Sequence, residues 1–122
     1  MSKILIVEDD NFLLEMIVKV CQKDDFDVSI SIDGEDALQK IQNETFDLVL
    51  LDLILPKLHG LELLEKLKNE GNNTPIIVLS NLYDQESVDK AKELGAKDYI
   101  VKAQSTPQEI VERVKTFLLE KI

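Results

Sequence analysis

Acidic, hydroxyl and basic residues stand at the ends of four short apolar runs in the sequence. They are distributed as follows: Glu8, Asp9 and Asp10 after residues 4–7, Asp52 after residues 48–51, Ser80 after residues 76–79, and Lys102 after residues 99–101. Carboxylates that meet in a folded chain repel one another and raise one another's pKa unless a cation neutralises them. If the fold brings these ends together, the residues predict an acidic cation site complemented by a hydroxyl and a lysine.

The chemistry that such a site supports is phosphoryl transfer. An all-oxygen site with several carboxylates selects a hard cation, and Mg²⁺ fits best because it binds through a few carboxylates and keeps waters that a phosphate replaces. Once a cation screens its charge, Asp52 becomes a nucleophile toward phosphorus, and the product is an aspartyl phosphate. Lys102 and the Ser80 hydroxyl then offer a cation and a hydrogen-bond donor to the phosphoryl oxygens.

The same apolar runs predict the strands that position these residues. The four runs are short and unbroken, which is typical of strands covered on both faces in a parallel sheet, whereas residues 28–32 alternate apolar with polar and predict a half-exposed edge strand. Helical periodicity lies between the strands, at about residues 12–20, from Asp33 onward, at residues 61–67, and from about 84 to 94 with Gly95 as its C-cap. A last helix begins with a Thr106–Glu109 capping box.

Strand and helix alternate five times along the chain, which predicts the fold class. Right-handed crossovers between parallel strands give an α/β fold, a three-layer doubly wound (βα)5 sandwich with helices on both faces. If the alternating strand lies at an edge, the flavodoxin-like strand order 2-1-3-4-5 follows, and ligands bind where the carboxyl ends of the strands meet.

Length and composition exclude several classes of protein. The 122 residues suit one domain, and we expect residues 1–122 to form it with no output domain. The net charge of −10 disfavours direct nucleic acid binding, and no apolar run is long enough to insert into a membrane. The N-terminus lacks a signal peptide, and the single cysteine, Cys21, forms no internal disulfide and suits a buried packing position, so we expect a cytoplasmic protein.

Taken together, these residues resemble the receiver domain of bacterial two-component response regulators, with the fold of the chemotaxis regulator. The resemblance covers essentially the whole chain and rests on residues 4–10, 51–56 with Gly60, 78–80 and 98–102. It implies that Asp52 accepts the phosphoryl group from a sensor histidine kinase or phosphotransfer protein. It also implies that Mg²⁺ is held by Asp9, Asp52 and the backbone carbonyl of Ile54, with Glu8 acting through a water.

The resemblance further implies a conformational switch. Ser80 would move toward the phosphoryl group, and Tyr99 would turn inward into the space that this motion opens. The surface of the fourth helix, fifth strand and fifth helix would then bind a downstream protein, with the chain a monomer or a phosphorylation-dependent dimer. From its own chemistry, Tyr99 is amphipathic and suits either a buried or an exposed position.

Four residues depart from the family's usual pattern or modify it. Asn81 replaces a very small residue and would partly cover the route to Asp52, and Ala103 replaces a proline, so that the Lys102–Ala103 peptide would be trans and the lysine less rigidly placed. Ile54 and Leu82 are aliphatic where the family flanks the phosphoryl group. Because neither side chain orients a water or acts as a base, we expect a long-lived aspartyl phosphate.

Two other functions remain open. The chain would be a protein-binding module of the same fold that works without phosphorylation, which Asn81 and Ala103 favour. Alternatively it would be an enzyme, but an aspartyl phosphatase needs an acid where Ile54 stands, and a flavin protein needs a glycine-rich phosphate loop where residues 8–10 are acidic. We therefore expect no organic cofactor, and a signalling domain with at most Mg²⁺-dependent self-phosphorylation and slow self-dephosphorylation.

Overall fold

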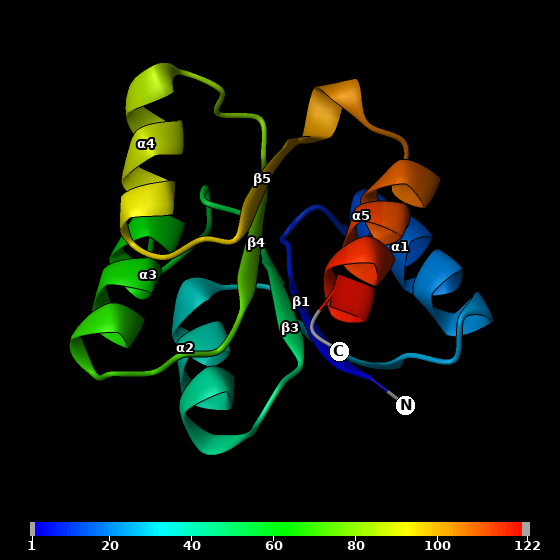
Figure 1. Cartoon of the computed structure of the whole chain (residues 1–122), viewed down its shortest axis with the longest axis horizontal. Helices are drawn as coiled ribbons and strands as arrows, with labels where there is room; N and C mark the ends of the chain where they lie inside the picture. Colours follow the sequence, from blue (N-terminus) through cyan, green and yellow to red (C-terminus); the bar gives the residue numbers. More distant parts are fainter. Residues whose placement is uncertain (1, 121–122) are drawn as a thin grey trace.

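A central parallel sheet separates two layers of helices in the computed structural model, which describes residues 2–120 (Figure 1). Its strands are β1 (Lys3–Val7), β2 (Asp27–Ser31), β3 (Leu48–Leu51), β4 (Ile76–Ser80) and β5 (Asp98–Val101). The helices are α1 (Asn11–Lys23), α2 (Gly34–Asn43), α3 (Gly60–Asn69), α4 (Gln85–Glu93) and α5 (Pro107–Glu120), with a 3₁₀ turn η1 (Lys102–Gln104) between β5 and α5.

The strand order is 2-1-3-4-5, and every neighbouring pair is parallel. Helices α2, α3 and α4 cover one face of the sheet, while α1 and α5 cover the other (Figure 1). The prediction of a three-layer, flavodoxin-like (βα)5 sandwich is therefore confirmed. The carboxyl ends of the strands lie at the same edge of the sheet, where η1 also lies.

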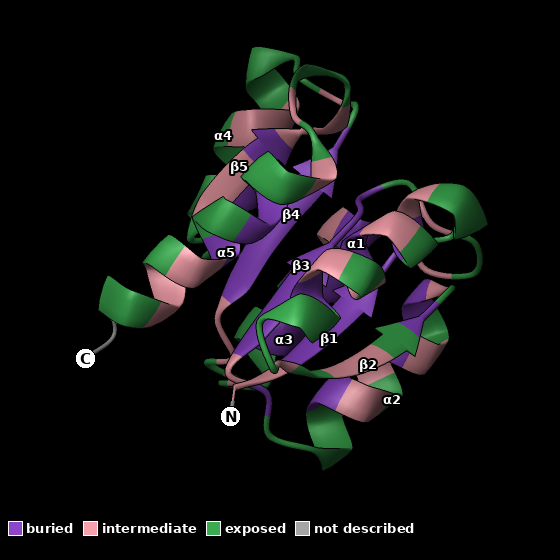
Figure 2. Ribbon diagram, turned by 90° about the vertical axis from the view of Figure 1, so that its right-hand side faces the viewer, coloured by how far each residue is buried: buried purple, intermediate pink, exposed green. Residues whose placement is uncertain are grey.

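Two apolar cores, one on each side of the sheet, explain why the strand sequences are unbroken. On β1, Leu5 and Val7 pack into the core beneath α2–α4, whereas Ile4 and Ile6 pack into the core beneath α1 and α5. Successive side chains of a strand point to opposite faces, so a strand covered on both sides is apolar at every position. Figure 2 shows the central strands as buried and the outer helix surfaces as exposed. Cys21 is buried in the second core, which confirms its predicted packing position.

The helix ends follow the predicted caps. The Thr106 backbone N–H donates to Glu109 Oε1 at 2.9 Å and the Glu109 N–H donates to Thr106 Oγ1 at 3.1 Å, which completes the capping box that begins α5. Asp33 caps α2, and Gly95 follows α4 with a φ of 104°. Only the bounds of the predicted helices were inexact: α1, for example, runs from Asn11 to Lys23 rather than from 12 to 20.

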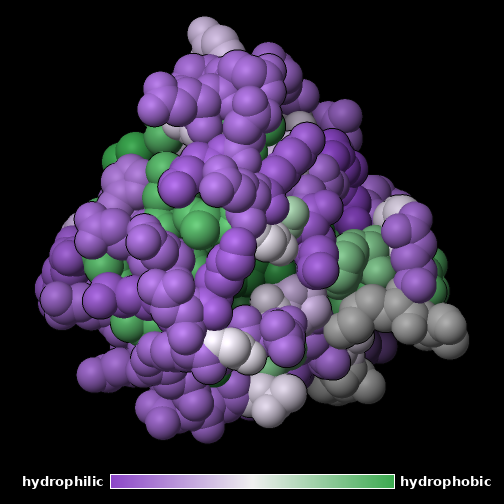
Figure 3. Space-filling model, turned by 60° about the vertical axis from the view of Figure 1, so that its left-hand side comes forward, coloured by the Kyte–Doolittle hydropathy of each residue, from purple (hydrophilic) through white to green (hydrophobic). Residues whose placement is uncertain are grey.

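Strand β2 lies at the edge of the sheet, as its alternating sequence predicts. The burial of its side chains does not follow their hydropathy. Ser31 is buried, whereas Ile30 and the adjoining Ile32 are exposed. On the side of α2–α4, hydrophilic side chains cover most of the surface and hydrophobic ones form small separate areas (Figure 3). Within residues 2–120, no helix combines the length and apolar character that crossing a membrane requires.

Candidate functional site

Three carboxylates gather at the carboxyl edge of the sheet. Glu8 and Asp9 follow β1 and Asp52 follows β3, and each offers one oxygen such that all three oxygens lie within 4.8 Å of one another. Glu8 and Asp52 are 1% and 4% exposed, whereas Asp9 is open to solvent. The predicted acidic cluster therefore forms, with its charge largely buried and one side accessible.

Lys102 supplies the positive charge that faces this cluster. Its Nζ lies 2.8 Å from Asp52 Oδ2 and 2.5 Å from Glu8 Oε1, so that one ammonium bridges both buried carboxylates. Burial alone lowers the pKa of Lys102, but the hydrogen bonds to Asp52 and Glu8 outweigh it and hold the pKa above its ordinary value. The lysine thus stays protonated in the pocket.

Glu8 is the carboxyl that this environment perturbs most. Burial raises its pKa, the hydrogen bond from Lys102 partly opposes this, and repulsion from Asp52 raises it again, so that the pKa is about 7. Its second oxygen, Oε2, accepts the Asp10 N–H at 3.3 Å. Burial and the neighbouring Asp52 charge therefore make Glu8 easier to protonate than an ordinary glutamate.

Asp52 is oriented from two sides. The backbone N–H of Ile54 donates to Oδ1 at 3.2 Å, and Lys102 donates to Oδ2 at 2.8 Å. The two contacts hold the plane of the carboxylate in one orientation. The Ile54 side chain is 52% exposed and lies at the mouth of the site rather than in the core.

Ser80 and Tyr99 form one hydrogen-bonded group with Leu82. Ser80 is fully buried, and its Oγ accepts the Leu82 N–H at 3.2 Å. The Tyr99 hydroxyl donates to the Leu82 carbonyl, and its ring packs against the core beneath α2–α4. Burial raises the pKa of Tyr99, with a hydrogen bond involving Ser80 opposing this in part. In this structure Tyr99 therefore points inward, toward the β4–α4 connection.

Asn81 and Ala103 contact each other, which the sequence did not reveal. Asn81 Oδ1 accepts the Ala103 N–H at 3.0 Å and joins the residues that follow β4 to those that follow β5. No peptide bond among the described residues is cis, as expected for Lys102–Ala103. Lys102, which precedes Ala103, contacts both buried carboxylates, and the expectation that Ala103 leaves it less rigidly placed stays a prediction. Residues 22 positions apart carry no local signal of such a contact.

Two neighbouring polar residues have structural partners. Asp10 caps α1 by accepting the Phe12 and Leu13 N–H groups at 3.1 and 3.3 Å, which agrees with its omission from the metal set. His59 immediately precedes α3. It is half-buried, and its Nδ1 accepts the Leu61 N–H at 3.1 Å to cap α3.

The carboxylate cluster fits Mg²⁺ on the chemistry of its donors. The cation prefers oxygen ligands, keeps part of its water shell and binds through one or two carboxylates. Asp9 is open to solvent and Glu8 and Asp52 are buried, and each offers one oxygen within 4.8 Å of the others. These residues fit the ion that the sequence predicts.

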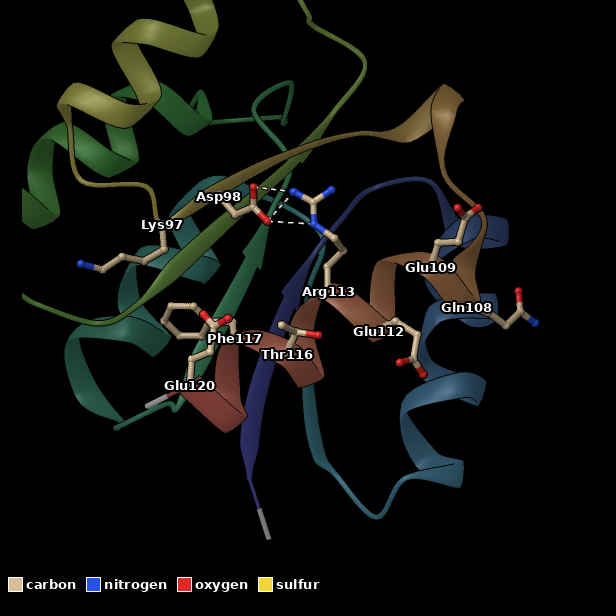
Figure 4. A pocket seen from close by; sticks show the side chains of 9 residues that line it. All are labelled: Lys97, Asp98, Gln108, Glu109, Glu112, Arg113, Thr116, Phe117 and Glu120. Carbon is tan, nitrogen blue, oxygen red and sulfur yellow. Dashed lines mark hydrogen bonds and ion pairs between the residues drawn. The ribbon is translucent and has the colours of Figure 1, made fainter. Parts of the chain in front are cut away.

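A surface pocket lies apart from this edge, along α5 and beside β5 (Figure 4). Its lining is mostly charged or polar and consists of Lys97, Asp98, Gln108, Glu109, Glu112, Arg113, Thr116, Phe117 and Glu120. Arg113 donates two hydrogen bonds to Asp98, from Nε to Oδ2 at 2.9 Å and from a terminal nitrogen to Oδ1 at 2.6 Å. Besides this ion pair the lining carries three carboxylates, those of Glu109, Glu112 and Glu120, and one ammonium, that of Lys97, so the pocket is acidic.

The fold and this edge together define a class: a doubly wound α/β domain with an acidic cation site, a buried aspartate and a lysine at the carboxyl ends of its strands. The model of the response regulator receiver domain family matches residues 4–115. The chain belongs to that family, and it is a signalling domain rather than a metabolic enzyme.

Similar proteins agree with this assignment. The response regulator ArlR of Staphylococcus saprophyticus is 37% identical over 97% of this chain and 53% of its own length. Among solved structures, a CheY-like receiver domain protein from Methanospirillum hungatei has a TM-score of 0.89 and 32% identity, covering 98% of this chain and 95% of that one. The BeF₃-activated receiver domain of DrrB, a Thermotoga maritima protein, has a TM-score of 0.83 and 37% identity over 97% of each chain.

The chain spans about half the length of the curated relatives it matches. The comparisons therefore assign the receiver domain and its role in two-component signalling. The prediction that residues 1–122 act without an output domain stays a prediction.

Proposed function

We propose that this chain accepts a phosphoryl group on Asp52 from a sensor histidine kinase or phosphotransfer protein, with Mg²⁺, and thereby switches a protein-binding surface. The observation that carries the proposal is the position of Asp52. It is a buried carboxylate with one oxygen on the Lys102 ammonium and with Asp9 and Glu8 beside it. Glu8 is also buried and also contacts Lys102, and the resemblance to the receiver family assigns the acceptor role to the acid that follows the third strand, Asp52.

The transfer step follows from these contacts. A carboxylate oxygen of Asp52 attacks the phosphorus of a phosphohistidine, the P–N bond breaks, and the imidazole nitrogen keeps the electron pair and takes up a proton. Lys102 and the Ser80 hydroxyl then donate to the phosphoryl oxygens. The Ser80 Oγ uses a lone pair to accept the Leu82 N–H, which leaves its own hydrogen for that donation.

The ligands that we assign to Mg²⁺ are Asp9, Asp52 and the Ile54 backbone carbonyl, with Glu8 acting through a water. The bound ion supplies charge neutralisation between the carboxylates and the incoming phosphate. The spacing of the three carboxylate oxygens supports this set. Asp9, as the exposed member, gives the ion and the phosphoryl donor a shared route of entry.

The signal would leave the site through Ser80 and Tyr99. Tyr99 lies on β5 and binds the Leu82 carbonyl, so that a movement of Ser80 toward a phosphoryl group changes its surroundings directly. We assign the α4, β5 and α5 face to a downstream protein. The acidic pocket on β5 and α5 indicates that this partner presents basic side chains (Figure 4). In this proposal the chain binds its partner either as a monomer or as a dimer that forms on phosphorylation.

Beryllofluoride with Mg²⁺ tests the proposal without a kinase. The chain has no tryptophan and two tyrosines, so tyrosine fluorescence reports on Tyr99, and Tyr83→Phe removes the exposed background. We expect a saturable change that requires Mg²⁺ and is absent in Asp52→Asn. A wild-type protein that shows neither this change nor phosphorylation, yet binds its partner, would instead be a phosphorylation-independent binding module.

A further inference from the structure

The hydrogen bond between Asn81 and Ala103 connects the two phosphoryl-recognition residues through their chain neighbours. Asn81 follows Ser80, the last residue of β4, and Ala103 follows Lys102, the first residue of η1. The Asn81 Oδ1 to Ala103 N distance is 3.0 Å. A single contact therefore joins the segment that carries the hydroxyl to the segment that carries the ammonium.

The 3₁₀ turn needs this contact because it lacks a cap of its own. The first N–H groups of a helical turn have no partner inside it and require an acceptor from elsewhere. Val101 occupies the N-cap position of η1 and makes no side-chain cap hydrogen bond. Asn81 supplies the acceptor instead, from a different segment of the chain.

Fixing the Ala103 N–H also fixes the backbone that carries Lys102. The Lys102–Ala103 peptide is planar, so an acceptor on its nitrogen orients the carbonyl side of Lys102 as well. From that backbone the lysine side chain, 15% exposed, reaches Asp52 at 2.8 Å and Glu8 at 2.5 Å. A turn freed from Asn81 would let this long side chain sample other rotamers and leave the two carboxylates unpaired for part of the time.

We propose that Asn81 is a positioning residue that holds Lys102 against Asp52 and Glu8. Its hydrogen bond restricts the backbone at Lys102, as a rigid residue after the lysine would otherwise do. The proposal rests on the proposed function only for its catalytic consequence. The geometric part concerns Lys102 in the protein before any phosphoryl group arrives. Asn81 acts on the two carboxylates through the turn, by its contact with Ala103.

The first test measures the contact and the lysine directly. In Asn81→Ala we expect faster hydrogen exchange at the Ala103 amide and about 2- to 10-fold faster acylation of Lys102 by an amine-reactive reagent, since one neutral hydrogen bond is removed. Asn81→Asp keeps an acceptor oxygen at the same place and should restore protection of the Ala103 amide. Asn73→Ala, at an exposed asparagine in the α3–β4 connection, should change neither rate.

The second test asks whether the effect passes through Lys102. Beryllofluoride binding with Mg²⁺ should weaken by about 2- to 10-fold in Asn81→Ala, and the same substitution should have no effect when Lys102 is already alanine. An equal effect in both backgrounds, or unchanged acylation of Lys102 in Asn81→Ala, overturns the proposal. If wild-type protein binds no beryllofluoride, the proposed function fails, and the acylation rate alone decides the positioning role.

Discussion

Replacing Lys102 by methionine removes the ammonium while keeping most of the aliphatic stem. The structure then leaves Glu8 and Asp52, 1% and 4% exposed, with no cation between them. Removing one partner of a buried ion pair is strongly destabilising because the remaining charge is uncompensated. The effect should therefore appear in the free energy of unfolding, measured without any added cation.

The magnitude follows from the separation of the two carboxylates. At the 4.8 Å limit of their oxygens and an effective dielectric constant of about 20, two like charges repel by about 3.5 kcal/mol. This agrees with the roughly 3–5 kcal/mol typical of a broken buried pair. Protonation of Glu8 relieves part of the repulsion, so we expect a loss of about 3 kcal/mol at pH 8 and about 2 kcal/mol at pH 6.

The sign of this pH dependence comes from Glu8. Its pKa of about 7 in the folded protein is above the ordinary value of 4.5, so over that range the folded state binds more protons than the unfolded state. Stability then falls as pH rises from 4.5 through 7, and losing Lys102 steepens the fall because the lysine lowers this pKa.

Urea unfolding at pH 6 and pH 8 checks the prediction for Lys102→Met. Lys66→Met, at an exposed lysine of α3, is the matched control and should change stability by less than about 0.5 kcal/mol at both pH values. A Lys102→Met protein as stable as wild type, or equally destabilised at pH 6 and pH 8, would refute the assignment of Lys102 as the cation that compensates both carboxylates.

Three further predictions concern metal, lifetime and stability. Mg²⁺ affinity should rise from pH 6 to pH 8, because Glu8, with a pKa of about 7, gives up its proton over this range. Isothermal titration calorimetry should also show that Mg²⁺ binding releases protons. An Mg²⁺ affinity that is the same at pH 6 and pH 8 contradicts this prediction. The aspartyl phosphate should outlast minutes, since Ile54 and Leu82 orient no water; phosphate release within seconds contradicts this. Thr106→Ala should cost about 1 kcal/mol in thermal unfolding by removing the α5 cap, with an unchanged melting temperature as the contrary result.

The sequence predicts most of this fold because its signals are local. An unbroken run such as residues 48–51 identifies a strand covered on both faces, and the Thr106–Glu109 pair marks the start of α5. Once the strand order is known, the residues after each strand must share one edge. Asp52, Glu8 and Lys102 therefore meet as expected.

The features that sequence reasoning missed depend on contacts between distant segments. Asn81 bonds to Ala103 across 22 residues, and no pattern around either residue announces it. The half-buried capping role of His59 depends on how its loop meets α3, and the burial of Ser31 depends on which elements cover an edge strand. The inward orientation of Tyr99 likewise follows from the position of the Leu82 carbonyl, which the sequence leaves undetermined.

The most direct measurement of the central claim is site-resolved mass spectrometry after incubation with acetyl phosphate and Mg²⁺. Borohydride reduction converts an aspartyl phosphate to homoserine and so marks the modified residue. We predict one marked residue, Asp52, only when Mg²⁺ is present, and none in Asp52→Asn. Marking of Glu8 or Asp9 in place of Asp52, or of no residue in a protein that a cognate kinase also fails to phosphorylate, would contradict the account.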